Sequence, residues 1–489
     1  MAAFRDLKMF VESAESLATA VALDSKKIAA RMMMIHMRQH ACMWDGFEAS
    51  CKEMIQHALE LPEDGSTHSE GAVFTLTAVE HPPEVMKLVA KQVAMTQAAG
   101  IAPMPERQMT WTRDGAQKLH IGLVSNDFYN HATAVLLVNV LENLDRSKLE
   151  ITLYSHGQVD NSQLSHRLIK SCDRFIDMTA ISTFQMAQQI YKDKVDILLD
   201  LKGHTNGNRM SLFAYRSAPI QVTYLGFPGT TGAPYMDYII GDQWVTPLDD
   251  APYYSECIAQ LPNSYQPNDS TREHPVAETR AQWGLPAHAK VLGCFNQAFK
   301  LTPETFHVWM SILQKVPDAV LWMLYDNEQA TRNICIESRK YGIDPERIYF
   351  TPKKEQTRHL GRLPVADLIL DNWPCNAHTT ASDALWMGVP IVTVTGQSFA
   401  SRVAGSLLHA VSLDELICKT PQDYENKVIE LLNNPSKLQS IRQHLQDGRA
   451  HFPLFDSVRY ARNFQQLLMR MADRAVRGQK PAALPVQPD

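Results

Sequence analysis

Polar side chains that could hold an anionic ligand gather in residues 378–383. Thr379 and Thr380 open a predicted helix, and His378 directly precedes them. The first backbone N–H groups of a helix have no acceptor within it and lie at the positive end of the helix dipole, so this position favours an anion such as phosphate. Asp383 lies one turn further along the same face, where a carboxylate suits the paired hydroxyls of a ribose. These residue types and spacings predict a site for a phosphorylated ligand.

Three other loops bring polar or cationic side chains that suit the same ligand. Lys300 can supply a full positive charge to phosphate oxygens. His359 and Arg362 are three residues apart, so on a helix they would share a face and could bracket the edge of a base. His131 follows a further apolar run. Each residue alone fits a structural explanation, such as a solvated lysine or a turn histidine, but their convergence at predicted strand ends favours a binding site.

Motifs of several other chemistries are missing from the sequence. The glycine-rich run at 226–232 (GFPGTTG) is neither GxGxxG nor a phosphate-binding loop, because no Gly-Lys-Ser/Thr follows it. A classical dinucleotide dehydrogenase or a kinase is therefore disfavoured. No HExxH or calcium-loop pattern occurs, so nothing in the sequence requires a metal. The 8 cysteines are scattered without a CxxC pair, which is typical of reduced thiols in a cytoplasmic protein.

The elements that position these residues alternate between strands and helices after residue 118. Short apolar runs rich in β-branched residues occur at 119–124, 150–154, 197–201, 220–225, 291–295, 320–324, 348–350, 368–370 and 391–394. This alternation is typical of parallel sheets covered by helices on both faces, and such sheets bind ligands beyond the carboxyl ends of their strands. The strands are too many for one sheet, so we predict an α/β fold with two doubly wound domains.

Shifts in residue pattern set the expected domain boundaries. Apolar residues recur at helical spacing through the first hundred residues, which predicts paired helices of a short α-solenoid. The proline-rich segment 262–275 is a natural hinge between the two α/β domains. The expected regions are a helical region at 1–105, a first α/β domain at 114–275, a second α/β domain at 276–455, a closing C-terminal helix at 456–475 and a disordered tail at 476–489.

Composition describes a globular chain and excludes several classes. The chain has 489 residues, a formal net charge of −6 and 20% charged residues, an ordinary balance for two or three domains. A slightly acidic chain lacks the positive field of a general nucleic-acid binder, so no nucleic-acid partner is expected. No apolar run approaches the roughly 18–20 residues of a membrane helix. The N-terminus has no continuous apolar stretch and does not read as a signal peptide, so a cytoplasmic location is expected.

Four longer segments carry a resemblance to a known family. They are SNDFYNHAT (125–133), APIQVTYLGFPGTTGAPYMDYI (218–239), FNQAFKLTPETFHVWMSILQKVPDAVLW (295–322) and CNAHTTASDALWMGVPIVTVTGQSFASRVAGSLL (375–408). Through them the chain resembles the O-linked N-acetylglucosamine transferase / SPINDLY family of protein glycosyltransferases, in a bacterial-type form with a short repeat region. The resemblance implies a GT-B fold, in which two doubly wound parallel-sheet domains face a cleft, preceded by an all-helical region like tetratricopeptide repeats (TPR).

The resemblance also implies roles for residues of the second α/β domain, the donor side. Lys300 is implied to contact the phosphates together with the donors at the helix start, and Asp383 to hold the ribose. The full set implied to bind the nucleotide is Gln297, Lys300, His359, Arg362, His378, Thr379, Thr380 and Asp383. One departure from animal members is Phe299, which stands where a tyrosine is usual before the lysine.

The first α/β domain is implied to be the acceptor side. His131 is implied to lie near the sugar and the α-phosphate, and Gly226 and Pro228 to line the sugar. His131 and Lys300 are therefore the expected catalytic residues. The identity of the general base stays open between His131 and a phosphate oxygen of the donor. A basic residue common in the family's Gly-Tyr-Thr-Lys-Gly loop is replaced here by Asn206.

The implied reaction is inverting transfer of a sugar from a nucleotide sugar to serine or threonine hydroxyls of a protein, without a cofactor or a metal. UDP-N-acetylglucosamine is the favoured donor, and SPINDLY relatives leave GDP-fucose as an alternative. A GT-B enzyme with a small-molecule or lipid acceptor, or a non-catalytic interaction protein, are further alternatives. The acceptor protein and the oligomeric state stay unknown. We expect the helical region to hold the acceptor, and the donor site not to need that region for its contacts.

Overall fold

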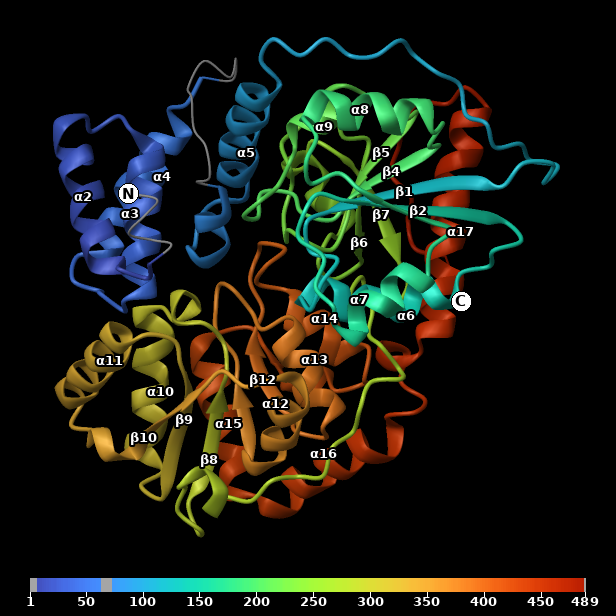
Figure 1. Ribbon diagram of the computed structural model, residues 1–489. Coiled ribbons are helices and arrows are strands. Elements are labelled where there is room, and N and C mark those ends of the chain that lie inside the picture. Colours follow the sequence, from blue (N-terminus) through green and yellow to red (C-terminus); the bar gives the residue numbers. More distant parts are fainter. Residues whose placement is uncertain (1–6, 63–72, 488–489) are drawn as a thin grey trace. The chain divides into compact units, whose positions relative to one another are not determined.

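The computed structural model describes residues 7–62 and 73–487, and the chain divides into two compact units. One of them, the six-stranded unit, consists of the chain up to His57, Thr75–Glu80 and Arg272–Phe452. The other, the seven-stranded unit, consists of Ala58–Phe74, His81–Thr271 and the chain from Pro453. Each unit contains one parallel sheet flanked by helices, so the expectation of two α/β domains is confirmed (Figure 1).

The seven-stranded sheet has the order β3-β2-β1-β4-β5-β6-β7, and all neighbouring strands are parallel. Its strands are β1 (Leu119–Ser125), β2 (Leu149–Ser155), β3 (Arg174–Asp177), β4 (Ile197–Asp200), β5 (Ile220–Thr223), β6 (Tyr238–Asp242) and β7 (Cys257–Leu261). The order reverses between β1 and β4. In doubly wound sheets a ligand crevice opens beyond the carboxyl ends of the strands at such a reversal.

The six-stranded sheet has the order β10-β9-β8-β11-β12-β13 and is also parallel throughout. Its strands are β8 (Lys290–Cys294), β9 (Ala319–Tyr325), β10 (Ile348–Pro352), β11 (Leu368–Leu370), β12 (Ile391–Val394) and β13 (Ile417–Cys418). The reversal lies between β8 and β11. The loops that follow these two strands carry most of the polar residues singled out in the sequence.

Helices flank both sheets, and their starts follow local cap chemistry. In the seven-stranded unit they are α5 (Pro83–Ala98), α6 (Ala132–Asn143), α7 (Gln163–Lys170), α8 (Thr183–Lys192), α9 (Ser211–Ala214) and α17 (Ser457–Val476). In the six-stranded unit they are α10 (Pro303–Lys315), α11 (Glu328–Lys340), α12 (Gln356–Arg362), α13 (Thr379–Trp386), α14 (Val403–His409), α15 (Pro421–Asn433) and α16 (Pro435–Gly448). The side chains of Thr302 and Thr420 cap α10 and α15, each before a proline, as predicted. None of the helices in the described part of the chain is long and apolar enough to cross a membrane.

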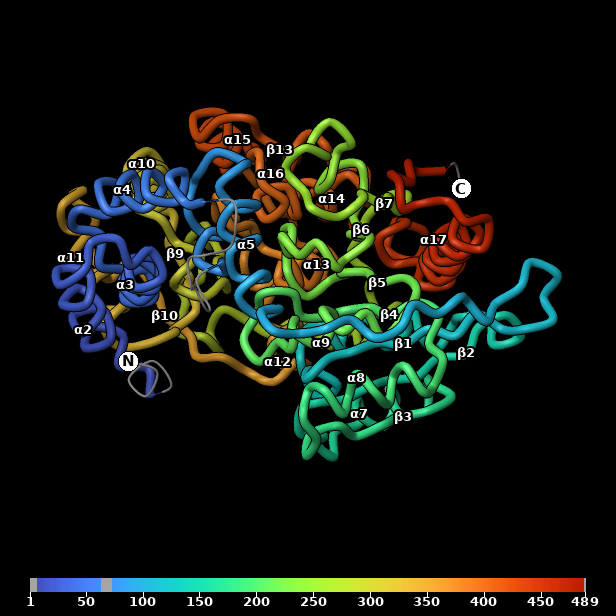
Figure 2. The backbone as a smooth tube through the Cα atoms, turned by 90° about the horizontal axis from the view of Figure 1, so that it is seen from above, coloured from blue at the N-terminus to red at the C-terminus, as the bar shows by residue number. Residues whose placement is uncertain are grey.

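The helical N-terminal region is divided between the two units. The helices α2 (Phe10–Leu23), α3 (Ile28–His40) and α4 (Phe47–Leu59) begin it, and the short 3-10 helix η1 (Val73–Ala78) follows. Nearly all of α2–α4 and most of η1 belong to the six-stranded unit, whereas α5 belongs to the seven-stranded unit. Two perpendicular views place α2–α4 (blue) beside α10 and α11 (yellow) of the same unit (Figures 1 and 2).

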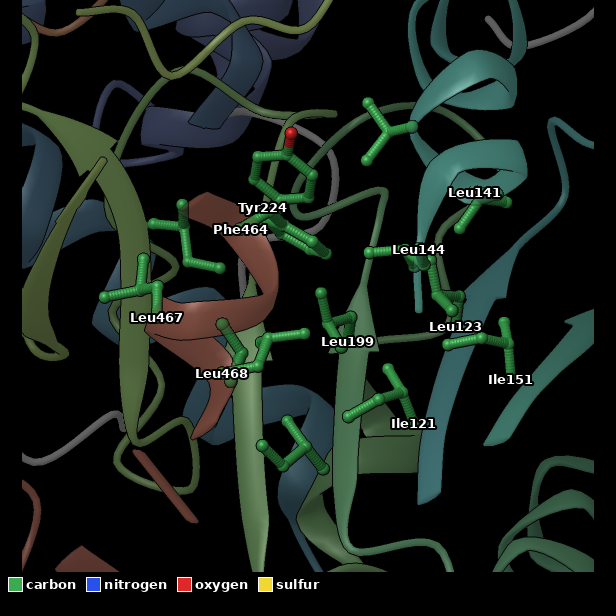
Figure 3. Close-up of a cluster of buried hydrophobic side chains, with 14 of the residues drawn as sticks. Ile121, Leu123, Leu141, Leu144, Ile151, Leu199, Tyr224, Phe464, Leu467 and Leu468 are labelled. Carbon is green, nitrogen blue, oxygen red and sulfur yellow. The ribbon is translucent and has the colours of Figure 1, made fainter. Parts of the chain in front are cut away.

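The core of the seven-stranded unit joins the sheet to the closing helix α17. Phe464, Leu467 and Leu468 of α17 are buried in one apolar cluster with Ile121 and Leu199 of the central strands (Figure 3). The apolar residues of α17 recur every three or four positions, so one face of the helix packs against the sheet. The helix expected at 456–475 thus forms, and its packing explains why the chain returns to this unit at its C-terminal end.

The pairing of Leu484 with β7 contradicts the expectation of a disordered tail at 476–489. The backbone N–H of Leu484 donates to Ile258 O at 2.9 Å, and the N–H of Gln260 donates to Leu484 O at 2.9 Å. Leu484 is buried and forms a parallel bridge with Ala259 of β7. The segment therefore satisfies backbone groups that the edge strand β7 would otherwise leave unpaired. Residues 488–489 lie outside the described residues.

We expect Phe464→Ala to lower the free energy of unfolding by about 3–5 kcal/mol, because a fully buried ring leaves a cavity among packed side chains. Val458→Ala is the matched control on the same helix, since Val458 is 60% exposed, and it should shift the unfolding midpoint little. Urea unfolding followed by circular dichroism measures both variants. Equal losses for the two variants would contradict the packing of α17 against the sheet.

Candidate functional site

Lys300 and the start of α13 converge at the carboxyl edge of the six-stranded sheet. Lys300 ends the 3-10 helix η4 (Ala298–Lys300), which follows β8, and α13 follows β11. The Lys300 ammonium donates a hydrogen bond to the backbone carbonyl of Asn376 at 2.7 Å. Asn376 lies two residues before His378. The structure therefore brings together two loops that lie about 75 residues apart in the sequence, as the strand order predicts.

A buried carboxylate fixes the loop that leads into α13. Asp371 accepts hydrogen bonds from the backbone N–H groups of Asn372 and Ala377 at 2.8 and 2.6 Å, and from the Thr393 hydroxyl at 2.6 Å. Burial raises the pKa of Asp371 to about 7, and the three hydrogen bonds and Lys300 act in the opposite direction. The sequence analysis assigned no role to Asp371. Its contacts make it a support for the loop.

The N-terminus of α13 presents donors without acceptors of its own helix. Thr379 and Thr380 supply its first two backbone N–H groups, and both side chains are half-buried. His378 precedes the helix without capping it through its side chain. Burial, followed by the Lys300 cation, holds the pKa of His378 well below its usual range. A neutral imidazole, two helix N–H groups and a lysine therefore lie together at this position, where the sequence analysis expects an anion.

One ring nitrogen of His378 is buried without a hydrogen-bond partner among the described residues. Its Nε2 is buried, and no group in residues 7–62 or 73–487 hydrogen-bonds to it. Leaving a buried polar atom unpaired is unfavourable, by roughly 1–3 kcal/mol. The single N–H of the neutral ring is engaged by the Ala400 carbonyl, so Nε2 is an acceptor, and a ligand hydroxyl at the start of α13 would supply the missing donor.

Asp383 lies one turn further along α13 and is already half of a buried ion pair. Its Oδ1 accepts from the Arg272 guanidinium at 2.8 Å, and both side chains are nearly fully buried. Arg272 also donates to Ser382 O at 3.2 Å and stacks on the Trp386 ring, 4.6 Å from its centre. The sequence analysis missed Arg272, because it treated segment 262–275 as a hinge and no local pattern links it to α13. Burial raises the pKa of Asp383, and Arg272 opposes that shift.

His359 and Arg362 share a face of α12, as their spacing predicts, and contact each other. The Arg362 guanidinium donates to His359 Nδ1 from Nη2 at 2.9 Å and from Nε at 3.2 Å. His359 Nδ1 is therefore unprotonated, and Nε2 carries the hydrogen of the neutral ring. His359 Nε2 lies 3.7 Å from Asp383 Oδ2. Arg362 itself is 1% exposed and packs over the Phe295 ring, so its contribution is to set the tautomer of His359.

Gln297 completes the donor-side residues proposed from sequence. It immediately precedes η4, its side chain is exposed, and its carbonyl accepts from the Lys300 N–H at 3.1 Å. All eight nucleotide-side residues thus lie in the six-stranded unit, in the loops and helices that follow β8, β10 and β11. In the described ranges, no three His, Cys, Asp or Glu side chains form a group that could hold a metal ion.

His131 lies in the seven-stranded unit, in the loop after β1. It caps α6, where its Nδ1 accepts from the Thr133 N–H at 3.3 Å, and it lies 3.5 Å from Asp127 Oδ2. The same Asp127 oxygen accepts from the Lys202 ammonium at 2.6 Å, and both members of this pair are buried. Sequence reasoning assigned no role to Asp127 or Lys202. Lys202 follows β4, the neighbour of β1 in the sheet, and that topology is the signal that could have found it.

Gly226 and Pro228 lie in the same unit, in the loop after β5. A Cβ atom at Gly226 would lie 1.9 Å from Leu201 O, so only glycine fits this approach of the two loops. Pro228 is buried. The loop is therefore packed against the segment that follows β4, which places it at the same carboxyl edge as His131.

Sequence and structure comparisons relate the chain to known glycosyltransferases. Residues 42–273 and 266–464 match the family described as glycosyl transferase family 41. The chain is 37% identical over 374 residues to a probable UDP-N-acetylglucosamine–peptide N-acetylglucosaminyltransferase SEC of Arabidopsis thaliana, covering 75% of this chain and 38% of that protein. It is 28% identical over 564 residues to the UDP-N-acetylglucosamine–peptide N-acetylglucosaminyltransferase of Caenorhabditis elegans, covering 89% and 48%. The chain thus spans less than half the length of these two curated relatives.

One solved structure resembles nearly the whole chain. A mutant of the O-GlcNAc transferase of Thermobaculum terrenum matches with a TM-score of 0.81 at 26% sequence identity. The match covers 96% of this chain and 88% of that one, including the helical N-terminal region. The likeness therefore extends to the helices as well as to both sheets.

The neutral state of His359 predicts acid sensitivity. Burial, followed by Arg362, lowers the pKa of His359 to about 3, below the value of about 6.5 in an unfolded chain. As the pH falls below 6.5 the unfolded chain binds a proton there and the folded chain does not, so stability falls by up to about 1.4 kcal/mol per pH unit. His359→Gln should remove this contribution and flatten the loss of stability between pH 6.5 and 5, measured by urea unfolding. An unchanged slope would contradict the neutral buried imidazole.

Proposed function

Because the chain belongs to glycosyl transferase family 41, we propose that it transfers N-acetylglucosamine from UDP-N-acetylglucosamine to serine or threonine hydroxyls of a protein. The names of the relatives from Arabidopsis thaliana and Caenorhabditis elegans support this donor and a peptide acceptor. The observation that carries the proposal is the convergence of Lys300 with the start of α13, one helical turn before buried Asp383. That arrangement suits a nucleoside diphosphate.

The donor side supplies the charge stabilisation. The bond between the anomeric carbon and the phosphate oxygen breaks, its electron pair stays with the diphosphate, and the anomeric carbon gains oxocarbenium character. Lys300 and the N–H groups of Thr379 and Thr380 stabilise the growing negative charge from positions fixed before the reaction. Neutral His378 lies beside these groups, directly before the start of α13. We propose that these groups do the work that a divalent metal does in other glycosyltransferases.

The nucleoside has a separate set of partners on the same unit. Asp383 Oδ2, which is not used by the Arg272 hydrogen bond, would accept from ribose hydroxyls. His359, with Nδ1 held by Arg362, offers an Nε2–H donor near the base. Gln297 is exposed before η4 and would approach the nucleotide from that loop.

The acceptor hydroxyl loses its proton as its oxygen bonds to the anomeric carbon. His131 or an oxygen of the departing diphosphate receives that proton. In the free protein His131 Nδ1 accepts from Thr133 N–H, so the neutral ring carries its hydrogen on Nε2. Use of Nε2 as the base requires the proton to move to Nδ1, where Asp127 is the nearest anion. Gly226 and Pro228 would line the sugar from the loop after β5.

The partners and location of the protein follow as further parts of the proposal. We propose a nucleotide sugar and an acceptor protein as partners, and no nucleic acid, since the net charge is −6. The 8 cysteines are free thiols, which fits a reducing compartment and hence the cytoplasm.

The test is incubation of the purified protein with a panel of nucleotide sugars that includes UDP-N-acetylglucosamine and GDP-fucose. Mass spectrometry should detect donor hydrolysis and addition of N-acetylhexosamine to the protein itself or to an acceptor. Turnover of GDP-fucose alone would overturn the proposed donor and support a fucosyltransferase. Transfer only to small molecules or lipids would overturn the protein acceptor.

Lys300→Ala should lower kcat by about 10²–10³-fold, the range for loss of one preorganised charge stabiliser. Lys290→Ala is the matched control, because Lys290 starts the same β8 strand at its opposite end and pairs with Asp318 at 3.2 Å. Steady-state hydrolysis and transfer rates measure both. A changed KM with unchanged kcat would restrict Lys300 to ground-state binding.

Activity should survive treatment with EDTA, because a lysine and helix N–H groups are proposed to stabilise the leaving diphosphate. The measurement is the transfer rate before and after chelation and dialysis. Loss of activity that Mg²⁺ or Mn²⁺ restores would overturn this part of the mechanism.

A further inference from the structure

Lys300 sits on η4, which is held from three sides. The backbone N–H of Ala298, its first residue, donates to Asp326 Oδ2 at 3.1 Å. The Lys300 ammonium, at its end, donates to Asn376 O at 2.7 Å. Between them Phe299 is 5% exposed, and its ring contacts α3 of the N-terminal helices. The contact of Phe299 with α3 is therefore a support of η4 that does not come from the loops at the strand ends.

The contact of Phe299 with α3 is made by two histidine rings. The Phe299 ring centre lies 5.1 Å from the rings of both His36 and His40. His40 stacks in turn on Phe10 of α2 at 4.5 Å and meets His36 edge to face at 4.7 Å. Burial, followed by Lys8, lowers the pKa of His40 to about 4, so the ring is neutral at ordinary pH. These four rings from α2, α3 and η4 form one aromatic cluster. Stacked and edge-to-face contacts of this kind stabilise aromatic rings.

The C-terminal end of α3 is tied to α11 and to the loop before it, which also holds η4. Asn327 Nδ2 donates to His40 O at 2.8 Å, and Asn333 Nδ2 donates to Ala41 O at 2.8 Å. Asn327 directly follows Asp326, the residue that accepts from the Ala298 N–H. Neighbouring residues of one loop thus fix both the helix end that carries His40 and the turn that carries Lys300.

We infer that His36 and His40 are positioning residues for Lys300, and that α2 and α3 are therefore a working part of the donor site. The inference rests on the role proposed for Lys300. When the ring of His36 or His40 is removed, Phe299 loses a packing contact. The 3-10 helix η4 can then rotate and move the Lys300 ammonium away from the start of α13. The N-terminal helices would thus serve the nucleotide side through the six-stranded unit, in contrast to the expectation that the donor site does not need them.

The experiment is a double-mutant cycle between His40→Ala and Lys300→Ala, read as kcat for donor hydrolysis. His40→Ala alone should lower kcat by about 10- to 100-fold, the scale of a misplacement of about 1 Å. In the Lys300→Ala background the same change should have almost no further effect, since no ammonium remains to be positioned. His40→Phe keeps a ring in the cluster and should restore most of kcat.

Trp44→Leu is the matched control. Trp44 belongs to the same helical region, but its ring packs on Phe306 of α10, 5.1 Å between ring centres. It should lower the melting temperature while leaving kcat close to that of the unaltered protein. A general loosening of the helical region would lower kcat in both variants and would overturn the inference.

The remaining outcomes separate the inference from the proposed function. Equal effects of His40→Ala in both backgrounds, or a kcat within about twofold of the unaltered protein, would overturn the positioning role alone. Unchanged turnover in Lys300→Ala would overturn the role proposed for Lys300, and the inference with it.

Discussion

The carboxylate of Asp371 fixes the loop on which the candidate donor site is built. Four residues separate Asn372 from Ala377, and both of their backbone N–H groups point at the same oxygen. Thr393 of the neighbouring strand β12 holds the other oxygen. The chain from β11 to α13 is therefore closed around one buried acceptor, which determines where α13 begins. Without the hydrogen bonds to Asp371, the first N–H groups of α13 would not be held at a fixed position relative to the Asn376 carbonyl, which accepts from Lys300.

Only some of the basic side chains in the candidate donor site carry a positive charge. Burial lowers the pKa of both His378 and His359, and the cations Lys300 and Arg362, respectively, lower it further. The histidines are thus neutral polar rings beside fixed cations. A ligand with a diphosphate and a base needs both kinds of partner, because the phosphates carry full charge and the base offers polar edges. The same principle governs Asp383, whose charge is balanced by Arg272 before any ligand arrives.

The seven-stranded unit repeats this use of buried ion pairs. Asp127 lies between the Lys202 ammonium and the His131 ring, and each partner comes from a different strand end. The pairing with Lys202 at 2.6 Å fixes the direction of this carboxylate toward His131. Such side chains meet at the strand ends that flank a reversal of strand order. The candidate site residues of both units therefore lie at equivalent positions of their sheets.

The sequence by itself determined the two parallel sheets, the helix starts at Thr302 and Thr420, and the loops that carry Lys300, His359, His378 and Asp383. These follow from local rules, since strand periodicity, cap residues and helix polarity act over a few positions. Only the tertiary structure decided the partners. Arg272 lies 111 residues from Asp383, and His40 lies far from Phe299 in the chain, so no local pattern links them.

The same distinction explains the two places where expectation and structure differ most. The proline- and alanine-rich tail has the composition of a disordered segment, yet Leu484 pairs with β7 because that edge strand offers free backbone groups. The first hundred residues read as one helical region, yet their helices divide between two units because each packs on a different sheet domain. Helical periodicity gives the apolar face of a helix, but the surface that covers this face is set by the rest of the fold.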